Sequence, residues 1–300
     1  MKSPYVICGA TGNVGSKVAK SLLAAGEPVR AVGRERVRLG PLAAIGAEPW
    51  PGDLGDATFL SKVFSGARAV FAMIPPKYDT PDIVAYQNGI GEALVSALEK
   101  ARVPRVVTLS SIGAHLFEGT GPIRGLHDLE KKLERLGNAG VVHLRAAYFM
   151  ENHLWNLPVI REHGVNGSPI RPDAAIPMVA THDIADEAAR LLLADTLSGH
   201  SVRYLLGPRD LTMTEATRIL GRAIGKPDLG YSQFPEEEAR KAMSGMGMTD
   251  SMVEALLEMQ RGFNAGRIRP TQERSASNTT PTTLEEFAQT VFARSYRAAA

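Results

Sequence analysis

A glycine-rich stretch near the start of the chain places the strongest constraint on its fold. Residues 8–15 read Cys-Gly-Ala-Thr-Gly-Asn-Val-Gly, after an apolar segment at 5–7 and before an amphipathic segment at 14–23. A buried strand, a glycine-rich turn and a helix in this order are typical of the first βαβ unit of a dinucleotide-binding domain. The sequence therefore predicts an α/β fold with a Rossmann-type, doubly wound parallel sheet.

The glycines of this stretch have separate physical roles. Gly9 permits the tight turn off the strand, Gly12 lets the backbone approach a pyrophosphate, and Gly15 lets the helix pack closely on the sheet. The helix would direct its free N–H groups and its positive dipole end at the phosphates. The alternative is that these glycines serve turn geometry alone. The residues that we expect to contact the cofactor here are Gly9, Thr11, Gly12, Asn13, Val14 and Gly15.

The segment from Gly9 to Gly15 also resembles the opening of the atypical short-chain dehydrogenases/reductases, in particular their NmrA-like branch. The resemblance extends over residues 1–152, continues less closely to about 207, and reappears at 282–287. Segments near 180 and 202 resemble late elements of the large domain, which implies that the smaller domain is discontinuous. The expected division is an NADP-binding Rossmann domain at 1–152 and 180–207, and a smaller, mainly helical substrate-binding domain at 153–179 and 208–300.

Bulk properties exclude several classes of partner. The chain has 300 residues with 44% hydrophobic and 22% charged side chains, and a formal net charge of +2, so neither nucleic acid nor an anionic membrane is indicated. No apolar run approaches the roughly 18 residues that span a bilayer. The first expected strand begins too close to Met1 for a signal peptide, and Cys8 is the only cysteine. We expect a cytoplasmic protein without membrane or nucleic-acid partners, and a homodimer stays open.

The tip of the second expected strand, at 28–33, predicts the choice of cofactor. An NAD-binding protein usually places an acidic residue there on the ribose hydroxyls. This chain has Arg34 instead, within a basic run that contains Glu35 as its one acidic residue. A guanidinium group suits the 2′-phosphate of NADP, whereas an acid would repel it. We therefore expect NADP(H) to be preferred over NAD(H), with a solvated basic loop as the alternative.

Further cofactor contacts are expected after the next three strands, because ligands of such sheets bind outside the carboxyl ends of the strands. An Asp-Leu pair follows the third strand and resembles the contact that the family makes with the adenine edge, although a turn aspartate is the alternative. The fourth strand, at 68–74, and the fifth, at 105–111, end in the same region. The expected contacts are Asp53, Leu54, Met73, Ile74, Pro75 and Ser110.

Three helix starts carry capping signals. Thr80 followed by Pro81 predicts the start of a long helix that runs to about residue 102. Thr212 and Thr283 are each followed three residues later by a glutamate, which predicts two capping boxes.

The usual catalytic pair of short-chain dehydrogenases is absent from the sequence. That pair is Tyr-x-x-x-Lys, and none of the seven tyrosines has a lysine four residues on. The helix expected at 125–133 has His127 and Lys131 on one face instead. An imidazole can donate a proton near neutral pH, and Lys131 could reach a ribose. The resemblance supports this role, because NmrA-like reductases often have histidine or lysine in place of the tyrosine; a solvated charged face is the alternative.

The segment after the sixth expected strand is predicted to face substrate. Residues 146–152 read Ala-Ala-Tyr-Phe-Met-Glu-Asn and resemble the passage of the family from the sheet to the substrate pocket. Tyr148, Phe149 and Asn152 are the expected substrate-binding residues. A hydrophobic hinge between domains is the alternative.

The resemblance implies one main function and one alternative. The first is an NADPH-dependent oxidoreductase that passes hydride directly to a small aromatic acceptor, such as a quinone, azo or triphenylmethane compound. No sequence feature indicates a flavin or metal site. The alternative is a non-catalytic, NADP-binding, redox-sensing regulator, which the missing tyrosine favours. An isomerase or epimerase on the same fold is disfavoured by that missing tyrosine.

Overall fold

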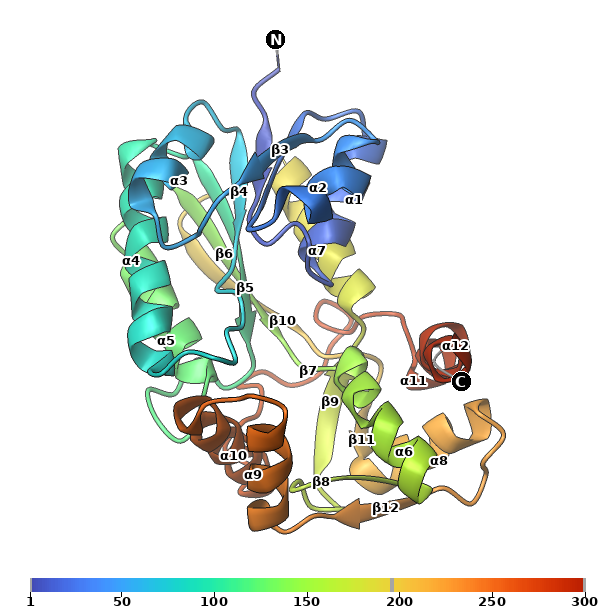
Figure 1. The fold of residues 1–300 in the computed structure, drawn as a ribbon. Helices are drawn as coiled ribbons and strands as arrows, with labels where there is room; N and C mark the ends of the chain where they lie inside the picture. Colours follow the sequence, from blue (N-terminus) through green and yellow to red (C-terminus); the bar gives the residue numbers. More distant parts are fainter. Residues whose placement is uncertain (1, 195–196, 299–300) are drawn as a thin grey trace.

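A parallel sheet of seven strands forms the centre of the molecule (Figure 1). The computed structural model describes residues 2–194 and 197–298. The strands lie in the order β3-β2-β1-β4-β5-β6-β10, and all neighbours pair in parallel. This order confirms the doubly wound α/β fold. The strands are β1 (Tyr5–Ile7), β2 (Val29–Gly33), β3 (Glu48–Pro51), β4 (Ala69–Ala72), β5 (Arg105–Ser111), β6 (Gly140–Ala146) and β10 (His200–Leu205).

Helices cover both faces of this sheet (Figure 1). Every residue of β1 and β4 is buried, as expected for central parallel strands with near-continuous apolar sequence. Helices α3, α4 and α5 lie on one face, and α1, α2 and α7 on the other, so that each face has its own apolar cluster. These helices are α1 (Gly15–Ala24), α2 (Arg36–Ala43), α3 (Ala57–Phe64), α4 (Ile83–Lys100), α5 (Ile123–Leu133) and α7 (Thr181–Leu193).

A smaller lobe lies next to the carboxyl ends of the large sheet (Figure 1). It contains two small sheets, with the strand orders β11-β9-β7 and β12-β8, and several helices. The pairing of β7 with β9 places residues 148–149 in this lobe. Its strands are β7 (Tyr148–Phe149), β8 (Val165–Ser168), β9 (Ala175–Val179), β11 (Asp210–Thr212) and β12 (Gly230–Gln233). Its helices are η1 (Met150–Asn156), α6 (Leu157–His163), α8 (Met213–Ala223), α9 (Glu236–Gly245), α10 (Asp250–Asn264), α11 (Leu284–Phe287), η2 (Ala288–Phe292) and α12 (Ala293–Ala298).

The start of α4 differs from the sequence prediction. Asp82 caps this helix by accepting the Ala85 N–H at 2.9 Å, and the first helical residue is Ile83, so the assignment of Thr80 as cap was wrong. The Thr80 hydroxyl donates to the Asp82 carbonyl oxygen at 3.1 Å instead of capping the helix, and a tertiary contact also holds Thr80. The carbonyl oxygen of Thr80 accepts a hydrogen bond from the Thr249 hydroxyl at 2.5 Å, which docks the preceding loop on α10.

Both predicted capping boxes are confirmed. Thr212 and Glu215 cap α8 reciprocally, and Thr283 and Glu286 do the same for α11. Within residues 2–194 and 197–298, no helix combines the length and the apolar character that crossing a membrane requires.

Candidate functional site

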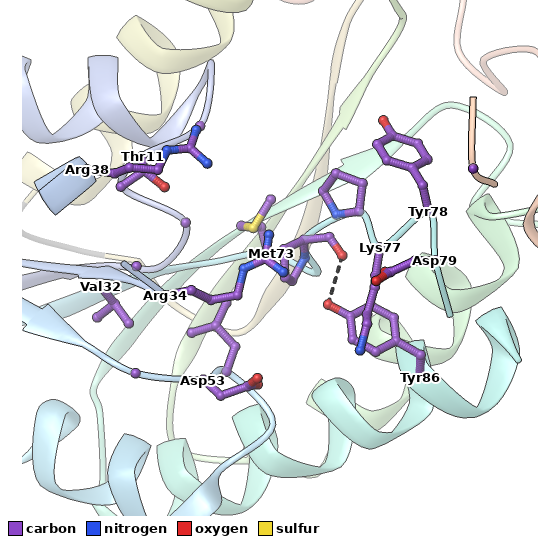
Figure 2. A pocket seen from close by; sticks show the side chains of 18 of the residues that line it. Thr11, Val32, Arg34, Arg38, Asp53, Met73, Lys77, Tyr78, Asp79 and Tyr86 are labelled. Carbon is purple, nitrogen blue, oxygen red and sulfur yellow. Dashed lines mark hydrogen bonds between the residues drawn. The ribbon is translucent and has the colours of Figure 1, made fainter. Parts of the chain in front are cut away.

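A cavity of about 660 Å³ opens at the carboxyl ends of β1, β2, β3 and β4 (Figure 2). Its wall comes from the turn after β1, the tip of β2, the segment after β3 and the loop after β4, and Met246 and Gly247 of the smaller lobe complete it. The strand order reverses between β1 and β4, which is where doubly wound sheets bind ligands.

The turn after β1 is built for a close backbone approach. Gly9 has a φ of +66°, in the left-handed region that favours glycine. A Cβ on Gly15 would lie 2.3 Å from the Gly9 carbonyl oxygen, so only glycine lets α1 start this close to the turn. No side chain caps α1, and its first turn has no acidic residue. Ser16 and Lys17 of this turn donate their N–H groups to the Gly12 and Val14 carbonyl oxygens, so an anionic ligand would be met by the N–H groups just before them, at 13–15.

The expected contact residues of this turn divide into two groups. Gly9, Thr11 and Gly12 line the cavity. Val14 is 5% exposed and packs into the core. The second group is Asn13, Val14 and Gly15. These residues lie at the start of α1 and do not line the cavity.

Two arginines make one end of the cavity cationic. Arg34 directly follows β2 and Arg38 lies in the first turn of α2, and both line the cavity (Figure 2). The acidic residue between them, Glu35, is exposed, and its carboxylate lies 3.9 Å from the Arg38 guanidinium. Two guanidinium groups at one end suit a phosphate group.

Asp53 and Leu54 line the same cavity. Asp53 Oδ1 accepts the Gly55 N–H at 2.7 Å, so this residue also shapes the turn after β3. Asp53 therefore both stabilises this turn and lines the cavity.

The loop after β4 supplies lining residues that the sequence analysis did not identify. The Tyr86 hydroxyl donates to the Pro75 carbonyl oxygen at 3.2 Å, and Lys77 Nζ lies 5.5 Å from the Tyr86 ring centroid (Figure 2). Burial raises the pKa of Tyr86. An aromatic residue inside a helical pattern carries no sequence signal of this role, since helix packing explains it equally well.

A second cavity, of about 270 Å³, adjoins the first. Met73, Pro75 and Pro76 line both cavities. Ile74 and Ser110, which were expected to contact the cofactor, line this smaller cavity and not the larger one. Most of the remaining wall is apolar and includes Ile123 and Leu126 of α5 and Met252, Met259 and Phe263 of α10.

The three expected substrate residues come together on one side of the smaller cavity. Tyr148, Phe149 and Asn152 all line it. The Tyr148 ring packs edge-on against Phe263 at 6.0 Å between centroids. Burial raises the pKa of Tyr148, so its hydroxyl stays protonated at neutral pH.

Comparison with known proteins identifies the family of this chain. The model of the NmrA-like family matches residues 1–288. The chain belongs to the NmrA-like family. This confirms the resemblance that the sequence showed at its glycine-rich turn. A curated relative, the NAD(P)H azoreductase of Xenophilus azovorans, is 29% identical over 256 residues and is matched over 85% of both chains.

Solved structures of NmrA-like proteins and related reductases share the fold. The NADPH-dependent quinone oxidoreductase QOR2 of Escherichia coli, complexed with NADPH, has a TM-score of 0.81 at 24% identity, with 96% of this chain and 99% of that chain covered. The triphenylmethane reductase of Citrobacter sp. has a TM-score of 0.75 at 20% identity, with 99% of each chain covered. NmrA, a negative transcriptional regulator in complex with NADP, has a TM-score of 0.74 at 18% identity, with 100% and 98% covered.

In this NmrA-like chain, His127 and Lys131 face away from both cavities. They line a third cavity, of about 360 Å³, that lies at the side of β6 and β10. His127 Nδ1 lies 2.9 Å from the Ala114 carbonyl oxygen, and Lys131 pairs with Glu134 at 2.9 Å. The structure therefore does not bring the expected catalytic pair to the larger or the smaller cavity. Helix α5 presents Leu126 to the smaller cavity instead.

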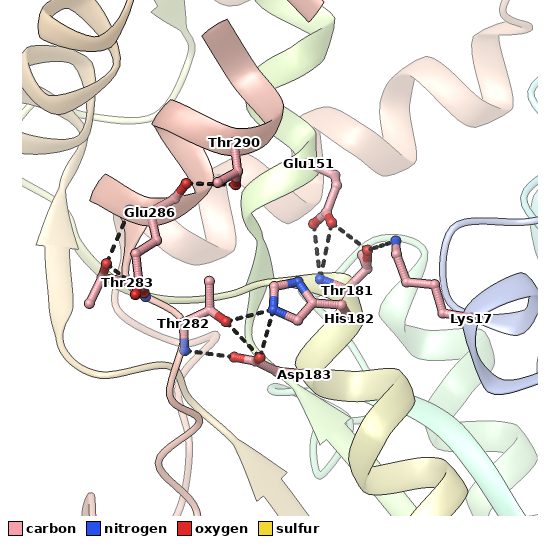
Figure 3. A network of polar contacts seen from close by, with 9 residues as sticks. All are labelled: Lys17, Glu151, Thr181, His182, Asp183, Thr282, Thr283, Glu286 and Thr290. Carbon is pink, nitrogen blue, oxygen red and sulfur yellow. Dashed lines mark hydrogen bonds and ion pairs between the residues drawn. The ribbon is translucent and has the colours of Figure 1, made fainter. Parts of the chain in front are cut away.

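A polar network connects the glycine-rich turn with the substrate side (Figure 3). Lys17 Nζ donates to the Asn13 carbonyl oxygen at 2.9 Å and to Thr181 Oγ1 at 2.7 Å. The Thr181 hydroxyl and backbone N–H both donate to the Glu151 carboxylate. Burial lowers the pKa of Lys17. Since Glu151 directly precedes Asn152, the network links the two walls of the site.

Cys8, the one cysteine of the sequence, is buried. Burial raises the pKa of Cys8 to about 12, so it stays a neutral thiol at pH 7. In the described ranges, 2–194 and 197–298, no group of three or more His, Cys, Asp or Glu side chains could hold a metal ion.

Proposed function

We propose that this protein is an NADPH-dependent reductase that passes a hydride to a flat aromatic acceptor such as a quinone, an azo compound or a triphenylmethane dye. The observation that carries the proposal is the junction of two unlike cavities at Met73, Pro75 and Pro76. One has a cationic end and a glycine-rich turn, and the other is mainly apolar. A dinucleotide in the first would present its nicotinamide end to a molecule in the second.

The residues of the larger cavity fit NADPH. The backbone from Gly9 to Gly12 and the uncapped start of α1 would hold the pyrophosphate. Arg34 and Arg38 would bind the 2′-phosphate, and the Asp53 carboxylate can accept a hydrogen bond from the adenine amino group. The bound cofactor supplies the hydride, while the chain supplies position and electrostatics.

The smaller cavity suits a flat aromatic acceptor. None of the described residues that line it is charged, and Tyr148, Phe149 and Phe263 offer aromatic surfaces. Tyr148 and Asn152 can hydrogen-bond to an oxygen or nitrogen atom of the acceptor. Neither histidine nor cysteine is among these lining residues, so we propose that solvent supplies the proton that completes the reduction.

Two relatives that are named as reductases support the proposal, and a third relative, a regulator, agrees with the non-catalytic alternative. The azoreductase relative and the quinone oxidoreductase structure match most of the chain. The structure of NmrA with NADP supports a non-catalytic regulator that binds dinucleotide and reports it to a protein partner. The specific observation that favours this alternative is the smaller cavity, because its described wall has no side chain that titrates near neutral pH.

Consumption of NADPH, followed by its absorbance with quinone, azo and triphenylmethane acceptors, separates the two functions. A reductase oxidises NADPH at a rate that rises with acceptor concentration and saturates. Binding of NADPH in calorimetry, without oxidation by any member of the panel, would instead favour the regulator. The protein denatured by heat serves as the control for non-enzymatic reduction.

A further inference from the structure

A buried polar chain leaves the smaller cavity between β5 and α5. Ser110 lines the cavity and is only 4% exposed, and its hydroxyl donates to Glu130 Oε1 at 2.5 Å. Arg145 engages both oxygens of this carboxylate, with Nε 3.1 Å from Oε1 and Nη2 2.6 Å from Oε2. A third donor of Arg145, Nη1, reaches the Tyr204 hydroxyl at 3.0 Å. Glu130 is therefore held from both sides.

The direction of the first hydrogen bond follows from the chemistry of these groups. A carboxylate in a two-bond pair with a guanidinium is ionised and can only accept hydrogen bonds. A serine hydroxyl has a single proton, and the Ser110 hydroxyl lies within hydrogen-bond distance of Glu130 Oε1. The Ser110 proton therefore points at Glu130, and only the lone pairs of Ser110 Oγ remain for a molecule in the cavity.

Other groups near Glu130 do not disturb this arrangement. His115 and His143 line the third cavity together with Glu130 and Arg145. Burial lowers the pKa of both histidines, which keeps them neutral at pH 7. Arg145 is then the cation that holds the Glu130 carboxylate. Burial alone would lower the pKa of Arg145, but the pairing with Glu130 helps to raise it.

We propose that Glu130, clamped by Arg145, makes Ser110 a hydrogen-bond acceptor in the smaller cavity and thereby selects ligands that carry an N–H or O–H group. This inference rests on the proposed function, since it assigns the smaller cavity to the acceptor. Ser110 is the residue that touches the ligand, and Glu130 is a positioning residue. The preferred substrate class is accordingly an amino- or hydroxy-substituted aromatic acceptor.

Binding of two matched naphthoquinones tests the proposal. One carries an amino group and the other a methoxy group at the same ring carbon, so only the first can donate a hydrogen bond. Calorimetry on the protein saturated with NADP⁺ measures both Kd values without turnover. Wild type should bind the amino compound about tenfold more tightly, which corresponds to one hydrogen bond. Ser110→Ala should remove this preference, whereas Ser111→Ala, at a neighbouring wall position, should keep it.

Glu130→Gln tests the positioning role of Glu130 through the ratio of the two Kd values, which a purely structural role would leave unchanged. The glutamine amide can donate to Ser110 Oγ, which frees the serine proton for the cavity and should reverse the preference toward the methoxy compound. Circular dichroism and NADPH affinity establish that this variant folds; if it does not, Ser110→Ala alone decides. Equal Kd values in wild type, or an amino preference that survives in Ser110→Ala, would overturn the inference and leave the reductase proposal to the NADPH assay. Failure of wild type to bind either compound would likewise overturn the inference, and the NADPH assay with the full acceptor panel would decide the reductase proposal separately.

Discussion

At the scale of single residues, Arg34 is the side chain on which the proposed preference for NADPH depends most directly. It lines the larger cavity at the tip of β2, and the acidic side chains that line the same cavity in the described chain are Asp53 and Asp79. A charge-assisted contact with the 2′-phosphate is worth roughly 1.5–3 kcal/mol.

We expect Arg34→Ala to weaken NADPH binding by about 10- to 100-fold and to leave NADH binding nearly unchanged. Calorimetric titration with both cofactors measures the difference. Arg36→Ala is the matched control, because Arg36 lies in the same basic run but does not line the cavity. Equal affinities of wild type for the two cofactors would contradict the assignment.

His127 illustrates a residue whose expected role depends on which side of a helix it occupies. Its ring lines the third cavity and contacts the Ala114 carbonyl oxygen. We therefore expect His127→Ala to change kcat/KM for a quinone by no more than about twofold, the range of substitutions away from critical features. A loss of tenfold or more, at unchanged NADPH affinity, would restore its role as proton donor.

His153 predicts a pH dependence of stability. It is 1% exposed, its two ring nitrogens have no hydrogen-bond partner among the described residues, and burial lowers its pKa from 6.5 to about 4. Below pH 6.5 the unfolded chain binds a proton that the folded protein does not, so stability is full above pH 6.5 and falls as pH decreases to about 4. The slope from this residue is about 1.4 kcal/mol per pH unit.

Urea unfolding of wild type and His153→Leu between these pH values isolates the contribution of the histidine. The variant should lose less stability than wild type on acidification, because leucine binds no proton in either state. Parallel stability curves for the two proteins would show that His153 is not buried as a neutral imidazole.

At the scale of elements, the start of α1 is one of the close backbone contacts of the fold. The Cβ of an alanine at position 15 would lie 2.3 Å from the Gly9 carbonyl oxygen, which is backbone and cannot move aside cheaply. We expect Gly15→Ala to lower the free energy of unfolding by roughly 1–3 kcal/mol through overpacking and to weaken NADPH binding. Thermal unfolding and calorimetry measure the two effects.

Gly89→Ala in α4 is the control for this prediction. Its new Cβ would meet no atom within 4 Å, so the substitution should be neutral or stabilise the helix by up to about 1 kcal/mol. If both variants had the same stability as wild type, the close approach of α1 to the turn would be refuted.

At the scale of the whole molecule, the smaller cavity exists only where the two lobes meet. The contact is made by α10, whose Thr249 hydroxyl donates to the Thr80 carbonyl oxygen and whose Ser251 hydroxyl oxygen accepts the Ile83 N–H at 3.0 Å. Residues Met252, Met259 and Phe263 of the same helix complete the cavity wall.

Thr249→Val should therefore loosen one wall of the acceptor site. We expect a higher KM for the acceptor, by several-fold, and a smaller loss of NADPH affinity, because the smaller lobe contributes Met246 and Gly247 to the larger cavity but not its glycine-rich turn. Steady-state kinetics and calorimetry measure both quantities. Thr214→Val, which removes a similar bond to the Pro172 carbonyl oxygen within the smaller lobe, is the control. An unchanged acceptor KM in Thr249→Val would contradict this account.

Much of the fold could be predicted because its signals are local. The glycine-rich stretch requires a strand before it and a helix after it, and the threonine–glutamate pairs specify helix starts through bonds that span three residues. Where a distant segment supplied a competing partner, as Thr249 does for Thr80, the local pattern predicted the wrong boundary.

The sequence by itself determined the parallel sheet and the position of its glycine-rich turn, because backbone conformation and apolar periodicity are properties of neighbouring residues. Only the tertiary structure decided which side chains share a cavity. Helical spacing places His127 and Lys131 on one face of α5, but the packing of that helix against α4 and β5 turns the face away from the smaller cavity. The same packing buries Glu130 beside Ser110, since a hydrogen bond across 20 residues depends on the fold as a whole.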